Sequence, residues 1–222
     1  MPKPPETASP TITVVDYGAG NLHSVRRALE AVGQQPLITD DPRVVDRAEA
    51  VIFPGVGSAQ DAMRALHRLD LVRCLRDFAA SGRPLFGVCV GLQVLYDGSD
   101  EGGGTECLGI LPGTVKQFPT GELKVPHLGW NTVSLRFAHP FVEDVPDASY
   151  FYFVHSYYPV PAEPATVLGE TEYGLSFASI VARDNIVATQ FHPEKSADLG
   201  LGLYARFARI VERARASSVG AA

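Results

Sequence analysis

A cysteine between two glycines is the residue of this 222-residue chain whose setting best suits nucleophilic chemistry. Gly87-Val88-Cys89-Val90-Gly91 overlaps the end of a predicted strand, Pro84–Val88, and leads into a helix. A tight strand-to-helix turn would expose Cys89 at the edge of a sheet, and flanking glycines would remove side chains that clash there. The amides and positive dipole end of that helix would favour the thiolate. Taken alone, the pentapeptide also fits a cysteine that is simply buried in a core.

A histidine and a glutamate two residues apart could supply the acid–base chemistry that such a cysteine needs. His192 and Glu194 follow a predicted strand, Ile186–Gln190. If the backbone stays extended there, both side chains project to the same side. A carboxylate beside an imidazole holds the ring in one tautomer and stabilises its charged form. We therefore interpret Cys89, His192 and Glu194 as a candidate nucleophile, general base and orienting group.

A third glycine-rich segment, Pro54-Gly55-Val56-Gly57, follows another predicted strand. Glycines at a strand end free backbone N–H groups to point into a cleft, as an oxyanion hole requires. The segment lacks the GK[ST] ending of a phosphate-binding P-loop. Residues 18–23 read G-A-G-N-L-H, so they do not form a dinucleotide-binding fingerprint either. An oxyanion hole is therefore the better interpretation of residues 54–57 than a nucleotide site.

The elements that must position these residues alternate between strand and helix over the first hundred residues. Helical patterns separate four apolar, β-branched runs that we expect to be strands: Thr11–Asp16, Gln35–Thr39, Ala50–Phe53 and Pro84–Val88. Short alternating units predict βαβ crossovers and a parallel sheet with helices on both faces. Ligands of such sheets bind beyond the carboxyl ends of the strands, where Gly18–Asn21, Pro54–Gly57 and Cys89 would converge.

The second half of the chain predicts an antiparallel extension. A hairpin turn is expected at Asp184-Asn185, a Pro-rich loop at Pro159–Pro164, and a closing helix around Leu203. Six strands are expected: Thr114–Gln117, Asn131–Arg136, Tyr150–Val154, Val167–Thr171, Phe177–Arg183 and Ile186–Gln190. The predicted organisation is a flexible N-terminal extension at 1–10, a single domain at 11–216 and a frayed tail at 217–222.

Composition excludes several classes of protein. The chain is 45% hydrophobic and 20% charged with a net charge of −6, which is typical of globular proteins and unsuited to a nucleic-acid surface. No apolar stretch approaches the ~20 residues that span a bilayer, and the first ten residues have no signal-peptide core. Cys74, Cys89 and Cys107 form no CxxC pair, so we expect neither disulfides nor a metal site, no cofactor, and a cytoplasmic location.

Taken together, these motifs resemble the triad-type, or class I, glutamine amidotransferases. Gly87–Gln93 (GVCVGLQ), Pro54–Gly57 (PGVG) and His192-Pro193-Glu194 carry that resemblance. Four further motifs narrow it to the glutaminase subunits of imidazole glycerol phosphate synthase: Asp16–Asn21 (DYGAGN), Pro126–Asn131 (PHLGWN), Phe153–Tyr157 (FVHSY) and Gln190–Ser196 (QFHPEKS). The resemblance implies a flavodoxin-like fold: a central, mostly parallel sheet flanked by helices, with the antiparallel β extension.

The resemblance also implies a reaction. Cys89 would attack the side-chain amide of glutamine, with His192 as acid and base and Glu194 as its orienting group. Gly55, Val56 and Val90 would form the oxyanion hole, which in the family becomes correctly oriented only when the partner is loaded. Residues that would bind glutamine are Gly57, Gln93, Ser156, Tyr157 and an acidic residue at Asp100 or Glu101. His127 and His155 lie within the shared motifs and are candidates for a supporting role.

The partner implied by the resemblance is a (β/α)₈-barrel cyclase subunit. Ammonia would pass to it and react with a phosphoribulosyl-formimino-AICAR nucleotide, giving imidazole glycerol phosphate and AICAR in histidine biosynthesis. Four residues match positions at the interface between the subunits: Asn21, Trp130, Tyr152 and Lys195.

Three other functions compete with this one. The chain could serve a different synthase, such as the pyridoxal-phosphate or anthranilate systems, against which the PHLGWN motif argues. It could be a stand-alone cysteine hydrolase of γ-glutamyl peptides, active without a partner. It could also be a non-catalytic subunit, although nothing structural requires Cys89, His192 and Glu194 together.

Overall fold

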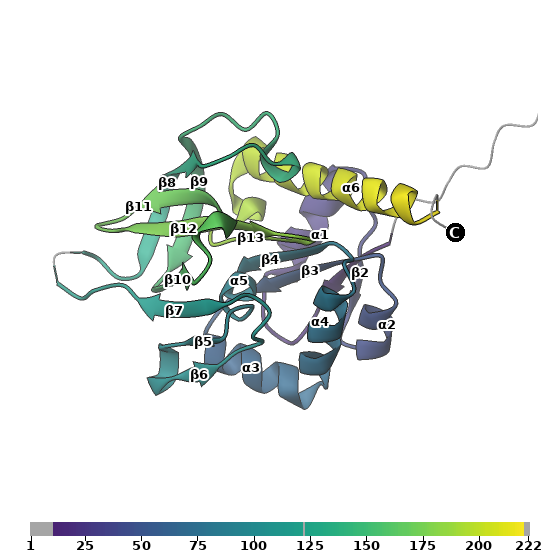
Figure 1. The fold of residues 1–222 in the computed structure, drawn as a ribbon, viewed down its shortest axis with the longest axis horizontal. Helices are drawn as coiled ribbons and strands as arrows, with labels where there is room; N and C mark the ends of the chain where they lie inside the picture. Colours follow the sequence, from purple (N-terminus) through teal and green to yellow (C-terminus); the bar gives the residue numbers. More distant parts are fainter. Residues whose placement is uncertain (1–10, 122, 220–222) are drawn as a thin grey trace, which may run out of the picture.

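The protein is described here by a computed structural model, which covers residues 11–121 and 123–219. Its centre is a nine-stranded sheet with the strand order β2-β1-β3-β4-β13-β12-β11-β8-β9 (Figure 1). A four-stranded sheet, β10-β7-β5-β6, lies beside it. One continuous apolar core includes side chains from both halves of the large sheet, such as Phe53 and Phe151.

The first five strands of the large sheet are parallel to one another. They are β1 (Ile12–Val15), β2 (Leu37–Thr39), β3 (Ala50–Gly55), β4 (Leu85–Cys89) and β13 (Ile186–Thr189). Four of them, all except the edge strand β2, are buried throughout, which explains their continuous apolar sequences. The order 2-1-3-4 followed by β13 is that of flavodoxin-like sheets, and it confirms the predicted fold. The strand predicted at Ile186–Gln190 was expected in the antiparallel extension, but β13 is parallel to β4 and antiparallel only to β12, so it joins the two halves of the sheet.

Helices cover both faces of the parallel half. They are α1 (Leu22–Ala31), α2 (Pro42–Asp46), α3 (Ala59–Arg68), α4 (Leu71–Ala80), α5 (Val90–Gln93) and α6 (Ala197–Val219). Figure 1 shows α1 and α6 over one face of the sheet, and α3 and α4 over the other. Side-chain oxygens cap three of the N-termini: Asn21 accepts from the Ser24 amide, Asp41 from the Arg43 amide and Ser58 from the Asp61 amide.

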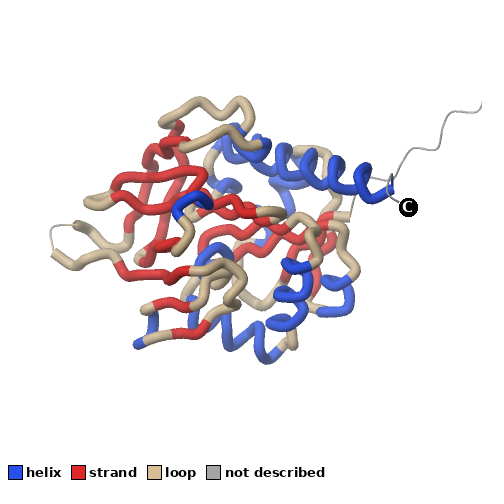
Figure 2. Tube along the Cα trace, in the orientation of Figure 1, coloured by secondary structure: helices blue, strands red, loops and turns tan. Residues whose placement is uncertain are grey.

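The antiparallel strands gather at the opposite end of the molecule from the C-terminus, as Figure 2 shows in red. In the large sheet they are β8 (His127–Leu135), β9 (Ser149–His155), β11 (Val167–Glu172) and β12 (Ser176–Arg183). The smaller sheet contains β5 (Gly98–Ser99), β6 (Thr105–Glu106), β7 (Gly113–Gln117) and β10 (Tyr157–Pro161). The hairpin predicted at Asp184-Asn185 is confirmed, because Arg183 pairs with Ile186 across it.

The expected loop at Pro159–Pro164 is wrong in its first half. Residues Tyr157–Pro161 form β10, which pairs with β7 and lies at the edge of the smaller sheet. An edge strand tolerates proline, because an amide that faces away from the neighbouring strand needs no partner in the ladder. The composition of this segment therefore misled the sequence-based interpretation.

The ends of the chain are only partly described. The predicted flexible extension at 1–10 lies outside the described residues, as do residues 220–222 of the predicted tail. Residues 217–219 of that tail belong to α6, which runs to Val219. No helix within the described residues is both long and apolar enough to cross a membrane.

Candidate active site

Cys89 lies at the carboxyl end of β4, where the chain turns abruptly into α5. Its backbone has φ 55° and ψ −110°, a conformation that L-residues rarely adopt. The turn places Val90 at the first position of α5, where the backbone N–H has no partner within the helix. Gly91 then packs so closely on β3 that a Cβ at this position would overlap the carbonyl oxygen of Phe53. The glycines predicted around Cys89 thus serve a steric purpose.

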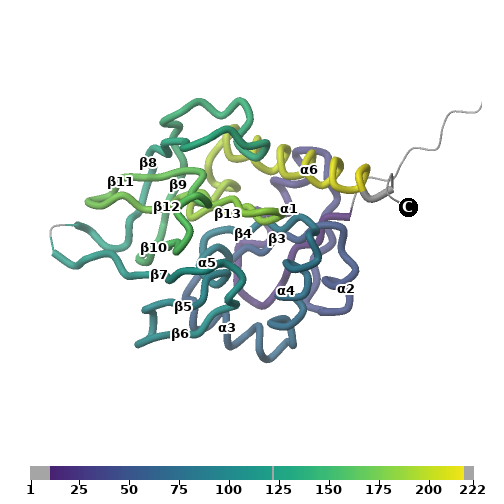
Figure 3. Tube along the Cα trace, in the orientation of Figure 1, coloured from purple at the N-terminus to yellow at the C-terminus, as the bar shows by residue number. Residues whose placement is uncertain are grey.

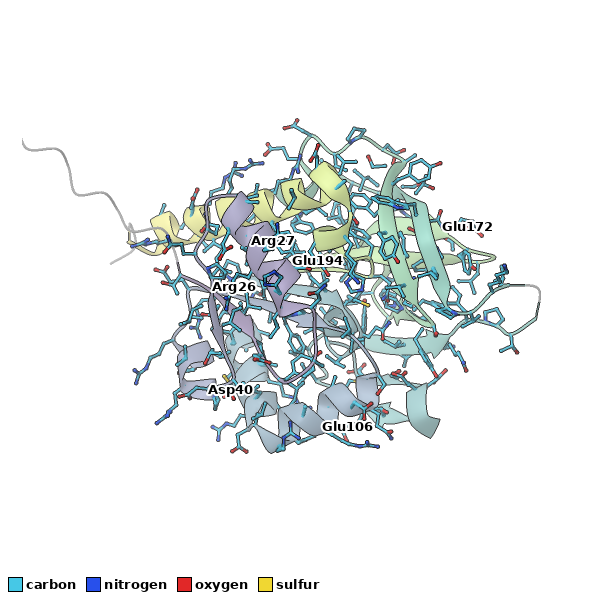
Figure 4. The ribbon with its side chains drawn as sticks, turned by 180° about the vertical axis from the view of Figure 1, so that it is seen from behind. Arg26, Arg27, Asp40, Glu106, Glu172 and Glu194 are labelled. Carbon is cyan, nitrogen blue, oxygen red and sulfur yellow. The ribbon has the colours of Figure 1, made fainter. Side chains whose placement is uncertain are left out.

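His192 and Glu194 follow β13, the strand that pairs with β4. The Nδ1 atom of His192 lies 2.8 Å from Oε1 of Glu194, and each side chain is only 2% exposed. The hydroxyl of Tyr204, on α6, donates to the other carboxylate oxygen at 3.4 Å. Figure 4, seen from behind, shows Glu194 close to α1 and α6. Because Nδ1 faces the carboxylate, Nε2 is the ring atom left for chemistry.

The route by which Glu194 reaches His192 differs from the expected one. The backbone is not extended after His192: residues Pro193–Lys195 form a single 3₁₀ turn. Proline has the φ value that such a turn needs, and its missing N–H costs nothing at the first helical position. The two side chains therefore meet across a turn rather than along one side of a strand.

The electrostatic setting of His192 favours its charged form. Burial on its own would lower the pKa of the ring, but the charge of the Cys89 sulfur, a hydrogen bond to it, and the Glu194 carboxylate together raise that pKa to about 10. The three side chains are therefore coupled: a proton that leaves the thiol is held on the imidazole between two anionic groups. This is the arrangement that a general acid and base beside a thiolate requires.

Ser196 fixes the turn that carries His192, and sequence reasoning gave this serine no role. Its hydroxyl donates to the carbonyl of His192 at 2.7 Å and accepts from the amide of Tyr152 at 3.0 Å. The amide of His192 in turn donates to the carbonyl of Tyr152 at 3.0 Å. These three hydrogen bonds attach the histidine to β9. The feature of the sequence that could have pointed to Ser196 was its position at the end of the QFHPEKS motif.

A cavity of about 420 Å³ opens beside Cys89 and His192. Nine of the residues predicted for the catalytic site or the interface line it: Val56, Gly57, Cys89, Val90, Gln93, Ser156, Tyr157, His192 and Lys195. These residues come from both halves of the chain. As the colours of Figure 3 show, β4 and β13 lie side by side although about a hundred residues separate them. Four further residues complete the lining: Glu101, Pro126, Val154 and His155.

Asp100, the first choice for the acidic residue that binds glutamine, does not line the cavity, whereas the alternative, Glu101, does. Asp100 is exposed. A 3₁₀ turn at Glu101–Gly103 directs the Glu101 side chain back toward α3, where its Oε2 accepts from the Ala59 amide at 2.6 Å. Burial raises the pKa of this carboxyl group, although the bond from Ala59 opposes that rise. Of the two candidates, Glu101 is therefore the one that lies in the cavity wall.

Two buried glutamines connect the nucleophile to the cavity wall. Nε2 of Gln93 donates to the carbonyl of Tyr157 at 3.0 Å and to Oε1 of Gln190 at 3.2 Å. Nε2 of Gln190 lies 3.8 Å from the sulfur of Cys89. Gln190 was predicted as the end of a strand, not as a site residue. A glutamine directly after a short strand that reads as buried was the signal that could have identified it.

Gly55 is adjacent to Cys89 in the register between β3 and β4. A Cβ here would come within 2.6 Å of the Tyr17 hydroxyl and 2.7 Å of the Gly91 amide, so only glycine fits. Burial and the nearby Cys89 sulfur raise the pKa of the Tyr17 hydroxyl, which therefore stays neutral. The next residue, Val56, is exposed at the rim of the cavity. The segment predicted as an oxyanion hole thus lies directly beside the nucleophile.

The four predicted interface residues lie at or near the surface around this site. Trp130 is 51% exposed, and its ring makes an edge contact with Tyr152, its partner in the β8–β9 register. The Lys195 ammonium lies 5.9 Å from the centre of the Tyr152 ring. Asn21, at the start of α1, is exposed as well. Two large apolar side chains extend this surface, Leu128 at 63% and Tyr150 at 60% exposed.

Among the described residues, no group of three or more His, Cys, Asp or Glu side chains could hold a metal ion.

Comparison with known proteins identifies relatives of the whole chain. The family model described as glutamine amidotransferase class-I matches residues 13–206. The chain is 48% identical to imidazole glycerol phosphate synthase subunit HisH of Dehalococcoides mccartyi, over 88% of this chain and 95% of that protein. It is 44% identical to subunit HisH of Chloroflexus aurantiacus, over 94% of this chain and all of that protein.

Solved structures show the same fold at low sequence identity. A glutamine amidotransferase from Thermotoga maritima superposes with a TM-score of 0.65 at 15% identity, covering 92% of this chain and 99% of that one. The structure of PurLQS from the same organism gives 0.68 at 18% identity, covering 91% of this chain and 97% of that one.

Proposed function

The chain belongs to the class I glutamine amidotransferases, among the HisH glutaminase subunits of imidazole glycerol phosphate synthase, and on that premise we propose how its site works. The observation that carries the mechanism is the buried set of Cys89, His192 and Glu194 at one wall of the 420 Å³ cavity. The overall reaction converts glutamine and water into glutamate and ammonia, for use in histidine biosynthesis.

In the first half of the reaction, Cys89 forms a bond to the side-chain carbonyl carbon of glutamine. His192 holds the proton that the thiol has released, and Glu194 stabilises the resulting imidazolium through the 2.8 Å contact with Nδ1. When the tetrahedral intermediate collapses, the carbon–nitrogen bond breaks and His192 gives its proton to the departing nitrogen. Ammonia leaves, and a γ-glutamyl thioester remains on the sulfur.

In the second half, water replaces ammonia. His192, now neutral, takes a proton from the water as it attacks the thioester carbonyl. The carbon–sulfur bond breaks, glutamate is released, and the thiolate is restored beside the imidazolium. The oxyanion of both tetrahedral intermediates is assigned to the amides of Val90, at the start of α5, and Val56, after Gly55. As in the family, we propose that the Gly55–Val56 peptide adopts its productive orientation only with the loaded partner.

Glutamine itself is proposed to bind in the cavity through Gly57, Gln93, Ser156 and Tyr157. Glu101 is assigned to the α-amino group, because among the described residues it is the only carboxylate in the cavity lining, and it is partly buried there. A carboxylate near a positively charged amino group selects an amino acid over a simple amide.

The proposed partner is a (β/α)₈-barrel cyclase that receives the ammonia and makes imidazole glycerol phosphate and AICAR. We assign its docking surface to Asn21, Trp130, Tyr152 and Lys195. Lys195 lines the cavity and lies beside Tyr152, Trp130 contacts Tyr152, and Asn21 is exposed at the start of α1. A dry junction there would keep ammonia unprotonated during transfer. We also propose a cytoplasmic location, because Cys74, Cys89 and Cys107 are all free thiols.

The experiment that tests this function measures glutamate release by the pure chain, alone and with a cyclase subunit plus its nucleotide substrate. We expect low activity alone and a steep rise with the loaded partner. High activity alone, unchanged by the partner and extended to substituted γ-glutamyl amides, would identify a stand-alone hydrolase instead. Stimulation only by the synthase of another pathway would identify a different partner.

A further inference from the structure

Two buried histidines form a direct pair behind the wall of the glutamine cavity. His127, at the start of β8, and His155, at the end of β9, face each other in the register between these strands. Nδ1 of His127 lies 3.0 Å from Nε2 of His155, and both residues are at most 5% exposed. His155 itself lines the cavity together with Ser156 and Tyr157. The catalytic steps described above use neither ring.

The hydrogen bonds around the pair determine where each ring carries its proton. Nδ1 of His155 lies 2.8 Å from the carbonyl oxygen of Tyr157, which can only accept, so this nitrogen must be the donor. Nε2 of His155 is then an acceptor, and it receives the proton of His127 Nδ1. Nε2 of His127 accepts from the side-chain amide of Asn131 at 3.2 Å. Both rings are therefore neutral and protonated on Nδ1.

Asn131 anchors the outer end of this chain of bonds. The same amide nitrogen also donates to the carbonyl of Glu172 at 3.0 Å, and its side-chain oxygen accepts from the Thr132 amide at 2.8 Å. Every polar atom of the Asn131 side chain thus has a partner, which leaves it one orientation. Figure 4 labels Glu172 at the antiparallel end of the molecule, where this anchor lies.

An aromatic enclosure keeps the pair neutral. The His127 ring stacks on Phe153 at 4.8 Å and on Tyr173 at 4.0 Å, with Phe118 and Phe177 in edge contact. His155 contacts Phe118, Phe153 and Phe177 as well. Burial lowers the pKa of His127 to about 4 and that of His155 to about 3. A charged His155 would also repel the imidazolium of His192.

The inner end of the chain reaches the substrate site. The carbonyl of Tyr157 accepts from two side chains, His155 on one side and Gln93 on the other. Gln93 continues to Gln190, which contacts the sulfur of Cys89. The position of the Tyr157 backbone, and with it the Ser156–Tyr157 wall, therefore depends on a donor that His127 and Asn131 hold in place.

We propose that His127 and His155 are positioning residues for glutamine. The two neutral rings, each held in one orientation, fix the position of Ser156 and Tyr157, the part of the cavity wall against which glutamine binds. The proposal deepens the proposed function and rests on it. Because the pair acts through Tyr157 and not on the reacting atoms, its loss should weaken the binding of glutamine more than it slows the chemical step.

The kinetic test compares two variants of His127 in the full chain with its loaded partner. His127→Phe keeps a stacking ring but removes both nitrogens, and we expect KM for glutamine to rise about tenfold, with kcat changed less than threefold. His127→Asn places an amide donor near the position of Nδ1, and we expect it to restore KM to within about threefold of wild type. Val45→Ala, in the buried face of α2, controls for a general loss of stability and should leave KM unchanged.

An equal KM in all variants, with the wild type active, would overturn the positioning role and leave the glutaminase function standing. The same holds if His127→Asn is as impaired as His127→Phe. If the wild type itself releases no glutamate with the loaded partner, the proposed function fails and the positioning role with it.

A second measurement uses only the wild-type protein, so it does not depend on whether a variant folds. In the ¹⁵N-labelled wild-type chain, the ring nitrogens of His127 and His155 should show the Nδ1-protonated neutral form at pH 7. Rings protonated on Nε2, or doubly protonated, would overturn the proposal directly.

Discussion

At the scale of single residues, the site depends on a strained cysteine and a coupled histidine. Cys89 is held at φ 55° because β4, α5 and the close approach of Gly91 to β3 leave it no other conformation. His192 gains its basicity from neighbours on both sides, the sulfur and Glu194. Neither property belongs to a residue by itself, since each arises from the groups packed around it.

Replacing the nucleophile should abolish turnover without disturbing the assembly. We expect Cys89→Ala to lower glutamate production by at least about 10⁴-fold, because no other group can form the thioester. Titration calorimetry should find partner binding within about threefold of wild type, since Cys89 is only 3% exposed. Turnover near that of the wild type would exclude Cys89 as the nucleophile.

The neutral histidine pair should make the fold sensitive to acid. Both rings have pKa values lowered from 6.5, to about 4 for His127 and about 3 for His155. Between pH 6.5 and 4 these two histidines bind protons in the unfolded chain but not in the folded chain, so the pair costs no stability above pH 6.5 and lowers stability increasingly as the pH falls below it. His127→Asn removes one of these groups.

We therefore expect thermal unfolding midpoints of the wild type to decline from pH 7 to pH 4, and those of His127→Asn to decline less steeply. The difference should correspond to about one proton fewer taken up on unfolding. His127 faces His155, Asn131 and Tyr173, and His155 faces His127 and His192, so within the described part of the chain no carboxylate acts on the pair to offset its protonation. Identical slopes for the two proteins would show that His127 is not held neutral.

At the scale of elements, the short helix α5 begins directly after Cys89 at the end of β4, the proposed reactive position. It packs against β3 through Gly91, where the backbone of Phe53 occupies the space of a side chain. On the other side of β4, the turn at Pro193–Lys195 is held between β9 and α6 by Ser196 and Tyr204. The distance between nucleophile and base therefore depends on two packing contacts, not on the motifs alone.

A methyl group at Gly91 should separate these elements. We expect Gly91→Ala to lower the free energy of unfolding by about 1–3 kcal/mol and to reduce glutaminase activity, because α5 must move away from β3. Gly33→Ala is the control: Gly33 has a positive φ of 82° but open space around it, so only backbone strain of about 1 kcal/mol is expected there. Denaturant unfolding measures both. Full activity and stability in Gly91→Ala would contradict the close packing.

At the scale of the whole molecule, the catalytic cavity opens next to the exposed surface of β8 and β9. Leu128, Trp130 and Tyr150 are more than half exposed there, although large apolar side chains usually avoid water. Lys195 lies in the cavity lining and beside Tyr152, so it belongs to both regions. This continuity between substrate site and surface suits an enzyme whose product passes to a second subunit.

Removing the Lys195 charge should affect coupling more than folding. We expect Lys195→Ala to reduce the stimulation of glutaminase activity by the loaded cyclase about tenfold, because an exposed ammonium at the proposed interface loses its partner contacts. Its unfolding midpoint should change little, since exposed charges contribute little to stability. The test compares activity with and without partner in both proteins. Unchanged stimulation would exclude Lys195 from the interface.

The sequence alone predicted four of the five parallel strands, the alternation of strands and helices in the first half, and Cys89, His192 and Glu194 as the candidate catalytic set. This was possible because each signal is local: buried strands have continuous apolar runs, and the glycines and the His-Pro-Glu stretch are adjacent to the residues they serve. The resemblance to glutamine amidotransferases depended on the same contiguous motifs.

Only the tertiary structure decided how distant segments meet. It placed Glu101, and not Asp100, in the cavity lining, at a 3₁₀ turn where the Glu101 carboxylate accepts from the Ala59 amide. It made β10 from a Pro-rich segment by pairing it with β7. It also paired His127 with His155 across β8 and β9, and it brought Gln190 next to Gln93 and Cys89. Side-chain direction at a turn and pairing between remote strands depend on the whole packed molecule, so no local stretch of sequence specifies them.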